Sequence, residues 1–246
     1  MRFTVFGTLA VAARIYVRNV LSFAILAALV YSPLIAYAIW DIHDITNEAT
    51  VAHTKERFTV LILVIFAGQY LLSKALAGAL AYGVFNQLRD TRVSLGSCIA
   101  NGIRRLVPVL LTSIILAILI GIGTAAYVLP GIVAACLSYV AVPAAVIEGH
   151  GPFKAFARSV KLVDSAVPRV FLLLVIFIAL QVGLYWGLVA ILDALIPYST
   201  MARLCAFLAL TILFGAFDAV LSSVAYAHLR ADRDGVDTAE LARVFD

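Results

Sequence analysis

Long apolar runs, separated by short polar segments, dominate the chain. A helix needs about 20 residues to cross an apolar bilayer core of about 30 Å, and six runs are long enough. The runs show no alternation of period two, and lipid cannot satisfy open backbone groups, so helices are expected rather than barrel strands. The predicted spans are 20–40, 58–85, 107–128, 129–147, 170–195 and 204–227, followed by a tail at 228–246.

A short amphipathic segment precedes each pair of predicted spans. In the third segment, Phe153, Phe156 and Val160 recur at helical spacing, while Lys154 and Lys161 fall on another face. This pattern is typical of a helix that lies in the membrane interface with its apolar side down. The three predicted interfacial helices are 3–18, 94–106 and 152–167.

The predicted fold class is therefore all-α, with one integral membrane domain over residues 1–246. It is a six-transmembrane-helix bundle built as three helical hairpins, each preceded by an interfacial amphipathic helix. Composition agrees with this, since 64% of the residues are hydrophobic and 13% are charged. A typical soluble domain has about half apolar and about a quarter charged residues.

The basic residues are distributed unequally between the two sides of the predicted bundle. Fourteen of the 18 Lys and Arg residues fall on the side of the termini, and three fall on the other side. By the positive-inside rule, both termini are expected in the cytoplasm, with the chain spanning the membrane several times. The basic residues are dispersed among apolar segments, so nucleic acid is not an expected partner.

The basic interfacial segments predict contact with anionic lipid headgroups of the cytoplasmic leaflet. The residues expected to make this contact are Arg14, Arg18, Arg104, Arg105, Lys154 and Lys161. On the other side, residues 41–57 form the main predicted external loop, which is rich in acidic residues. His43 and His53 leave a metal site open there, but their spacing matches no known motif, and a solvated acidic loop is the prediction.

Two ionisable residues interrupt the apolar runs. Lys74 lies in the middle of run 58–85, and Asp218 lies in run 204–227. An ionised Lys at the centre of a membrane helix costs roughly 2.5 to 3.5 kcal/mol, so it needs a partner or water. Counted along the helices at about 1.5 Å per residue, the two residues lie at depths that differ by only about 5 Å. We therefore predict a Lys74–Asp218 pair, serving either as a clamp between helices or as part of a proton or ion relay.

Sequence motifs of enzymes are missing from the chain. It contains no GxSxG or HExxH motif, no P-loop and no dinucleotide fingerprint in a suitable context. Cysteine and histidine spacings do not match a zinc site. The chain is therefore expected to be non-enzymatic, without a cofactor or a metal.

A pattern in the centre of the chain resembles a known family. Residues 128–132 (VLPGI), 142–149 (VPAAVIEG) and 151–159 (GPFKAFARS) resemble the bacterial glycerophosphoryl diester phosphodiesterase membrane-domain family and are similar to the YciC-like inner-membrane proteins. Residues 225–230 (AYAHLR) and 241–246 (LARVFD) resemble the end of such proteins.

In some members of this family the membrane module precedes a catalytic phosphodiesterase domain. Only about 19 residues follow the sixth predicted span, so neither that domain nor its activity is expected here. The resemblance implies a structural corner where the fourth span meets the third interfacial helix, with Glu148 and Arg158 paired at the cytoplasmic interface.

Two functions are compatible with these features. The first is a non-enzymatic scaffold, accessory subunit or lipid-interacting membrane organiser, with a membrane-protein partner or a second copy of the chain as further partners. The alternative is a small transporter or channel that uses the Lys74–Asp218 pair. A water-accessible cavity that reaches this pair would favour the second function, and a dry, closely packed bundle would count against it.

Overall fold

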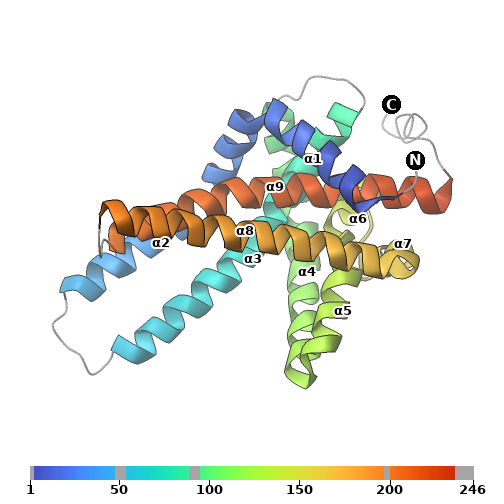
Figure 1. Ribbon diagram of the computed structural model, residues 1–246. Helices are drawn as coiled ribbons and strands as arrows, with labels where there is room; N and C mark the ends of the chain where they lie inside the picture. Colours follow the sequence, from blue (N-terminus) through green and yellow to red (C-terminus); the bar gives the residue numbers. More distant parts are fainter. Residues whose placement is uncertain (1–2, 48–53, 89–94, 197–199, 236–246) are drawn as a thin grey trace.

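The computed structural model describes residues 3–47, 54–88, 95–196 and 200–235, and nearly all of these residues are helical (Figure 1). No strand occurs in these ranges, so the all-α fold class is confirmed. The elements are α1 (Val5–Arg18), α2 (Val20–Asn47), α3 (Thr54–Leu88), α4 (Leu95–Ala126), α5 (Val128–Ser138), α6 (Ala141–Glu148), α7 (Pro152–Val163), η1 (Asp164–Ala166), α8 (Val167–Leu195) and α9 (Thr200–Asp234).

Five helical segments of the described chain are long and apolar enough to cross a membrane, and they indicate a multi-pass membrane protein. The predicted second span, 58–85, lies inside the 35-residue helix α3. Its first part falls outside the residues whose surroundings the structure describes, so a sixth crossing stays a prediction. The five segments are Val20–Tyr37, Gly102–Ala126, Val128–Glu148, Pro152–Leu195 and Cys205–Asp234.

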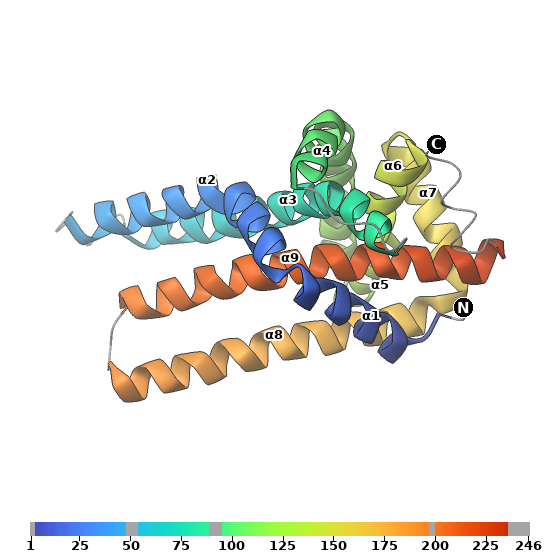
Figure 2. The same cartoon turned by 90° about the horizontal axis from the view of Figure 1, so that it is seen from above.

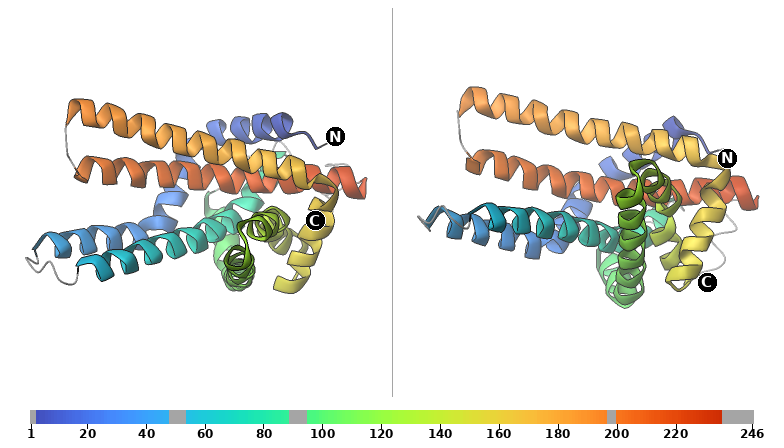
Figure 3. Two further views of the ribbon diagram at one scale, coloured as in Figure 1. Left: turned by 60° about the horizontal axis from the view of Figure 1, so that its bottom comes forward. Right: turned by 90° about the horizontal axis from the view of Figure 1, so that it is seen from below.

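The long helices pack as three antiparallel pairs, α2 with α3, α4 with α5, and α8 with α9. The pairs meet at one end of the molecule and diverge from it, with α8 and α9 running to the left of Figure 1 and α4 and α5 pointing downward. Figures 2 and 3 show the same divergence from other sides. We call the shared end the base; α1, α6, α7 and the last turns of α9 lie there. The opposite ends of the three pairs are called the outer ends.

The best-buried part of the core lies toward the base. Every residue of α6 from Ala141 to Ile147 is buried, as is every residue of α9 from Ala219 to Leu229. These two segments pack against each other and against the buried stretch of α3 from Leu76 to Ala81. The short helix α6 therefore holds the three pairs together.

Large apolar side chains cover the outside of the pairs. Ile122 on α4 is 66% exposed, and Ile178 and Leu184 on α8 are 54% and 49% exposed. Exposing an apolar surface of this extent to water is energetically unfavourable, whereas contact with the acyl chains of a bilayer is not. The distribution of exposed residues thus agrees with the membrane assignment made from length and composition.

The predicted interfacial helix at 94–106 is not a separate element. From Leu95 onward it is the first part of α4, which continues through the predicted span 107–128 despite Pro108 in its interior. The close approach of α4 to α3 explains the continuity, because a Cβ on Gly102 would lie only 2.8 Å from the Ala79 Cβ. The small residue Gly102 makes the contact with α3, whereas the apolar residues Ile103 and Leu106 of the predicted stripe are 70% and 39% exposed.

The predicted fourth span, 129–147, is interrupted. It consists of α5 and α6, separated by a turn at Tyr139 and Val140. Pro143 supplies the physical reason, because a proline has no N–H to donate and its ring clashes with the carbonyl four residues earlier, here that of Tyr139. The helix therefore ends before Tyr139 and a new one starts at Ala141.

The predicted interfacial helices at 3–18 and 152–167 correspond in position to α1 and α7. The second ends earlier than predicted, at Val163, where η1 leads into α8. The predicted apolar stripe of α7 is only partly correct, since Phe153 is 73% exposed while Ala155 and Ser159 are fully buried. These small residues let α7 approach α5 closely, and Ser159 Oγ donates a hydrogen bond of 2.6 Å to the Leu137 carbonyl.

The predicted external loop at 41–57 is shorter than expected. Helix α2 continues to Asn47 and α3 begins at Thr54, because polar residues do not stop a helix that is already formed. Residues 48–53 lie outside the described residues, and so does the predicted tail from 236 onward. The part of that tail up to Asp234 continues α9.

Candidate functional site

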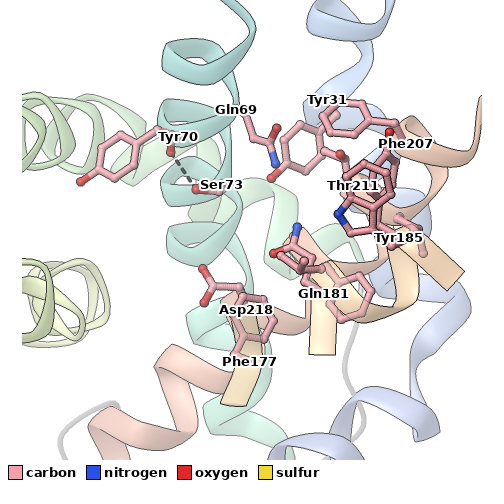
Figure 4. A pocket seen from close by; sticks show the side chains of 15 residues that line it. Tyr31, Gln69, Tyr70, Ser73, Phe177, Gln181, Tyr185, Phe207, Thr211 and Asp218 are labelled. Carbon is pink, nitrogen blue, oxygen red and sulfur yellow. Dashed lines mark hydrogen bonds between the residues drawn. The ribbon is translucent and has the colours of Figure 1, made fainter. Parts of the chain in front are cut away.

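A cavity of about 510 Å³ lies between the α2/α3 pair and the α8/α9 pair (Figure 4). Binding sites for small molecules typically have volumes of about 300 to 1,000 Å³. Seven of the 15 described lining residues are aromatic and come from all four helices, whereas α4 to α7 provide none of these lining residues. The aromatic residues are Tyr31, Tyr70, Phe177, Tyr185, Trp186, Phe207 and Phe214.

Polar groups follow the length of the cavity. Gln69 on α3 and Gln181 on α8 lie across it from each other, and Thr211 and Asp218 come from α9 (Figure 4). At about 1.5 Å per residue, Asp218 lies about 16 Å closer to the base than Phe207 on the same helix. The cavity thus has aromatic rings along its length, amide and hydroxyl groups in the middle and a carboxylate at its inner end.

The outer part of the cavity is ordered by contacts between rings. Tyr185 meets Trp186 and Phe207 edge to face, with ring centroids 5.7 and 6.0 Å apart. Further in, Phe177 meets Phe214 in the same way at 6.0 Å. Edge-to-face pairs contribute about 0.5 to 1.5 kcal/mol beyond the burial of their area, so these contacts help to hold the wall in place.

The structure brings the predicted partners Lys74 and Asp218 together. Lys74 Nζ lies 3.8 Å from Asp218 Oδ2, and each side chain is 16% exposed. Asp218 borders the cavity, whereas Lys74 is not one of the residues that line it. The ion pair therefore closes the inner end of the cavity, with the carboxylate toward the cavity.

Tyr139 completes the surroundings of this ion pair. Its hydroxyl donates a hydrogen bond of 3.1 Å to Asp218 Oδ1. The Lys74 ammonium lies 6.0 Å from the centre of the Tyr139 ring and 5.6 Å from that of the Tyr70 ring, within the range of cation–π interaction. Tyr139 lies in the turn between α5 and α6. The interruption of the fourth span therefore positions a hydrogen-bond donor for Asp218.

Tyr31 lines the cavity with a hydroxyl that lacks a partner. The residue is 1% exposed, and among the described residues no hydrogen-bond partner reaches its hydroxyl. A Cβ on Gly215 would lie 2.5 Å from the Tyr31 Oη, so the glycine provides the space for this side chain. An unpaired buried hydroxyl costs about 1 to 3 kcal/mol, which makes it an unusual feature of a stable core.

The predicted partners Glu148 and Arg158 also meet, at the base. Arg158 Nε donates to both Glu148 carboxylate oxygens, at 2.9 and 3.1 Å. Glu148 Oε1 accepts a further hydrogen bond of 2.6 Å from the Tyr226 hydroxyl on α9. Gly149 follows Glu148 with a positive φ of 67°, a conformation that favours glycine and that ends α6 at this point.

The Glu148–Arg158 pair belongs to a larger polar cluster. Arg158 also contacts Asp234 at the end of α9, and Arg230 Nε lies 3.7 Å from the same carboxylate. Arg230 Nη1 lies 4.0 Å from Glu148 Oε1. Two carboxylates and two guanidinium groups thus join α6, α7 and α9, and we call Glu148, Arg158, Tyr226, Arg230 and Asp234 the base cluster.

Most of the basic residues predicted to contact headgroups are exposed. Arg14, Arg18, Arg104, Lys154 and Lys161 are exposed on α1, α4 and α7. Arg105 differs, because it is half-buried and its guanidinium lies 3.3 Å from where a Cβ on Gly149 would be. Arg105 therefore lies next to the residue that follows Glu148.

The described residues contain no group of three or more His, Cys, Asp and Glu side chains that could hold a metal ion. His53 lies outside the described residues, and the surroundings of His43 are not among those described. The metal site left open for the predicted loop is thus not tested.

Comparisons with protein-family models, curated proteins and solved structures found no match. What is known of the site consequently comes from its own geometry. Sequence reasoning found Asp218, Lys74, Glu148 and Arg158, but it missed Tyr139, Tyr226 and Asp234. Pro143 was the available signal for Tyr139, because a proline in the fourth span predicts an interruption four residues before it.

Proposed function

We propose that this protein binds a small amphiphilic molecule within the bilayer, in the cavity between the α2/α3 and α8/α9 pairs, and does so without catalysing a reaction. The observation that carries the proposal is the cavity itself, which combines aromatic walls with polar groups that end at Asp218. An amphiphile matches this arrangement, because its apolar body contacts the rings while its head meets the amides, hydroxyls and carboxylate. This cavity supports lipid interaction, and because it reaches Asp218 it also meets the condition stated for a small transporter or channel.

The proposed setting is a bacterial inner membrane crossed six times, with α3 as the sixth crossing and both termini in the cytoplasm. The unequal distribution of Lys and Arg supports this orientation, which puts the base at the cytoplasmic surface. The exposed basic residues of α1 and α7 then face anionic headgroups, as expected for helices at an interface. Reporter fusions after residues 50, 198 and 246 test it, and an external C-terminus would overturn it.

A cavity-filling variant tests ligand binding. Val182 on α8 lines the cavity and is 49% exposed, so Val182→Trp blocks the cavity with little cost to the core. Ile178→Trp is the matched control, because Ile178 lies on the same helix with a similar exposure of 54% but does not line the cavity. Native mass spectrometry of protein extracted with its lipids is expected to show one bound molecule in the wild type and in the control, and none in Val182→Trp. Equal occupancy in all three proteins would contradict the proposal.

Transport of the bound molecule is a second candidate function, and two observations favour it. The Lys74–Asp218 pair borders the cavity, and the interruption between α5 and α6 places the Tyr139 hydroxyl on Asp218. Interrupted helices beside a binding site are a recurrent feature of transporters. Proteoliposomes loaded with the identified molecule test this function. Flux in the wild type that is lost in Asp218→Asn supports transport. Binding without flux contradicts transport and leaves binding as the function.

A further inference from the structure

We infer that the molecule bound in this cavity is a monovalent organic cation with an apolar body, whose charged head lies beside Asp218. This inference rests on the proposed function, since it specifies the chemical class of the amphiphile. It depends on the charge of the cavity lining, on the position of the Lys74 ammonium and on the unpaired hydroxyl of Tyr31.

The lining of the cavity has a negative character. Asp218 is its single ionisable carboxylate, and no Lys, Arg or His is found among the described residues that line it. Seven aromatic rings surround the remaining space. The faces of these rings are negative and attract cations, and they offer nothing to a phosphate or carboxylate head. An anionic lipid head would therefore find no cation in the lining, because Lys74, which pairs with Asp218, is not one of the residues that line the cavity.

Lys74 already holds an ammonium group where the inference places a cation. Its Nζ lies 3.8 Å from Asp218 Oδ2, and the rings of Tyr70 and Tyr139 lie 5.6 and 6.0 Å from it. The Asp218 carboxylate and the aromatic rings around it thus form a site that binds a positive group. In this structure the positive group is the Lys74 ammonium, which reaches the carboxylate from α3. The ion-pair distance of 3.8 Å is at the long end for a contact pair, so Asp218 is not held in a close bidentate contact that would exclude a second cation.

The side chain of Tyr31 lines the cavity, and its hydroxyl oxygen is buried without a hydrogen-bond partner among the described residues. Such an oxygen is suited to a positive head that donates a hydrogen bond or carries diffuse charge. Because an unpaired buried hydroxyl is costly, a rotation of the Tyr31 side chain that lets a bound cationic head contact this oxygen would recover part of the cost.

These features make Lys74 a competitor for the bound cation. Both positive groups require the Asp218 carboxylate, so removal of the Lys74 charge leaves that carboxylate free for the ligand. The consequence is opposite for the two members of the pair. Asp218→Asn weakens binding of a cation, whereas Lys74→Gln strengthens it.

Two probes of nearly the same shape and opposite charge test the inference. Tetraphenylphosphonium is a lipophilic cation and tetraphenylborate is the matching anion, and their binding to the protein in nanodiscs is measured by equilibrium dialysis against empty nanodiscs. We expect saturable binding of the cation, weakened at least about tenfold in Asp218→Asn and strengthened several-fold in Lys74→Gln. The anion is expected to show no saturable binding above that of empty nanodiscs.

Asp193→Asn is the matched control. Asp193 is also a carboxylate on one of the four helices, but it pairs with Arg203 at 2.8 Å and does not line the cavity. Its substitution should leave cation binding unchanged. Cation binding that is equal in the wild type and in Asp218→Asn would overturn the inference, and so would stronger binding of the anion.

The failure of the inference is distinguishable from the failure of the proposed function. If Val182→Trp abolishes occupancy by a neutral or anionic molecule, the cavity binds an amphiphile and only the assigned charge is wrong. If Val182→Trp and Asp218→Asn change neither the binding of the two probes nor the occupancy by a co-purified molecule, the proposed function is wrong as well. Thermal unfolding of each variant in the same nanodiscs shows whether a loss of binding reflects a loss of fold.

Discussion

Lys74 on α3 and Asp218 on α9 form an ion pair, with Nζ 3.8 Å from Oδ2, in a part of the molecule where apolar side chains surround both helices. The Tyr139 hydroxyl bonds the other carboxylate oxygen of Asp218, so three helical segments meet at this carboxylate. The pair also separates the base, where the core is well buried, from the cavity between the outer halves of α3 and α9.

A double-mutant cycle is expected to show that this pair is coupled. Removing one partner of a fully buried ion pair lowers the free energy of unfolding by about 3 to 5 kcal/mol. Lys74 and Asp218 are each 16% exposed beside a cavity. We therefore expect a smaller loss, about 2 kcal/mol, for Lys74→Met or Asp218→Asn alone. The double variant should cost at least about 1 kcal/mol less than the two single changes together. Denaturant unfolding in detergent micelles measures this, and additive effects would show that the two charges are independent.

The base cluster predicts a large effect at Glu148. Its carboxylate accepts hydrogen bonds from Arg158 and Tyr226 and is 11% exposed, so Glu148→Ala leaves both donors without this acceptor. We expect the free energy of unfolding to fall by about 2 to 3 kcal/mol. Asp232→Ala serves as control, because Asp232 is exposed on the neighbouring turn of α9 and should change stability by less than about 0.5 kcal/mol. Equal effects of the two changes would argue against a stabilising role of the cluster.

The close approach of α5 to α4 is expected to require glycine at position 131, in the first turn of α5. A Cβ there would lie 2.2 Å from Thr124 Oγ1 and 2.9 Å from the Thr124 backbone nitrogen. The backbone cannot yield as a flexible side chain would, so Gly131→Ala should lower the melting temperature and cost about 1 to 3 kcal/mol.

Gly187→Ala on α8 is the matched control for this change. A Cβ at Gly187 would meet no atom within 4 Å, so alanine should be neutral or should stabilise the helix by up to about 1 kcal/mol. The same thermal unfolding experiment compares both variants. A stable Gly131→Ala protein would mean that α4 and α5 are further apart than the structure places them.

Tyr31→Phe is expected to make the ligand-free protein more stable. The change removes a buried hydroxyl that lacks a partner among the described residues, and such a group costs about 1 to 3 kcal/mol. We expect a gain of about 1 kcal/mol, measured by unfolding of delipidated protein. Gly215→Ala should act in the opposite direction, since its Cβ would lie 2.5 Å from the Tyr31 Oη. A loss of stability in Tyr31→Phe would mean that the hydroxyl already has a partner in the free protein.

Charge and apolar length predicted much of this arrangement. The position of Lys74 and Asp218 could be predicted because a charge in lipid needs a partner at the same depth, and depth can be counted along a helix. The meeting of Glu148 and Arg158 was implied by the resemblance of residues 142–159 to a membrane-domain family. That resemblance stays a hypothesis, because the comparisons found no match.

The cavity could not be predicted, because it depends on how two hairpins lie relative to each other. The sequence does not show that Gln69 and Gln181 face each other. The apolar residues around them could contact either lipid or another helix. For the same reason the segment 94–106 was predicted as a separate interfacial helix. Its close approach to α3 is made at Gly102, opposite Ala79, a neighbour that periodicity alone does not identify.

The divergence of the three pairs has a mechanical consequence for the bilayer. Helix α8 has 29 residues and extends over about 43 Å, well beyond the roughly 30 Å of an apolar core, so a tilted course fits it to the membrane. Pairs that tilt away from a shared base occupy more area in one leaflet than in the other. In the orientation proposed above, this arrangement would give the molecule a wedge shape within the bilayer. Its stability is then expected to depend on membrane curvature and lateral tension as well as on the contacts within the protein.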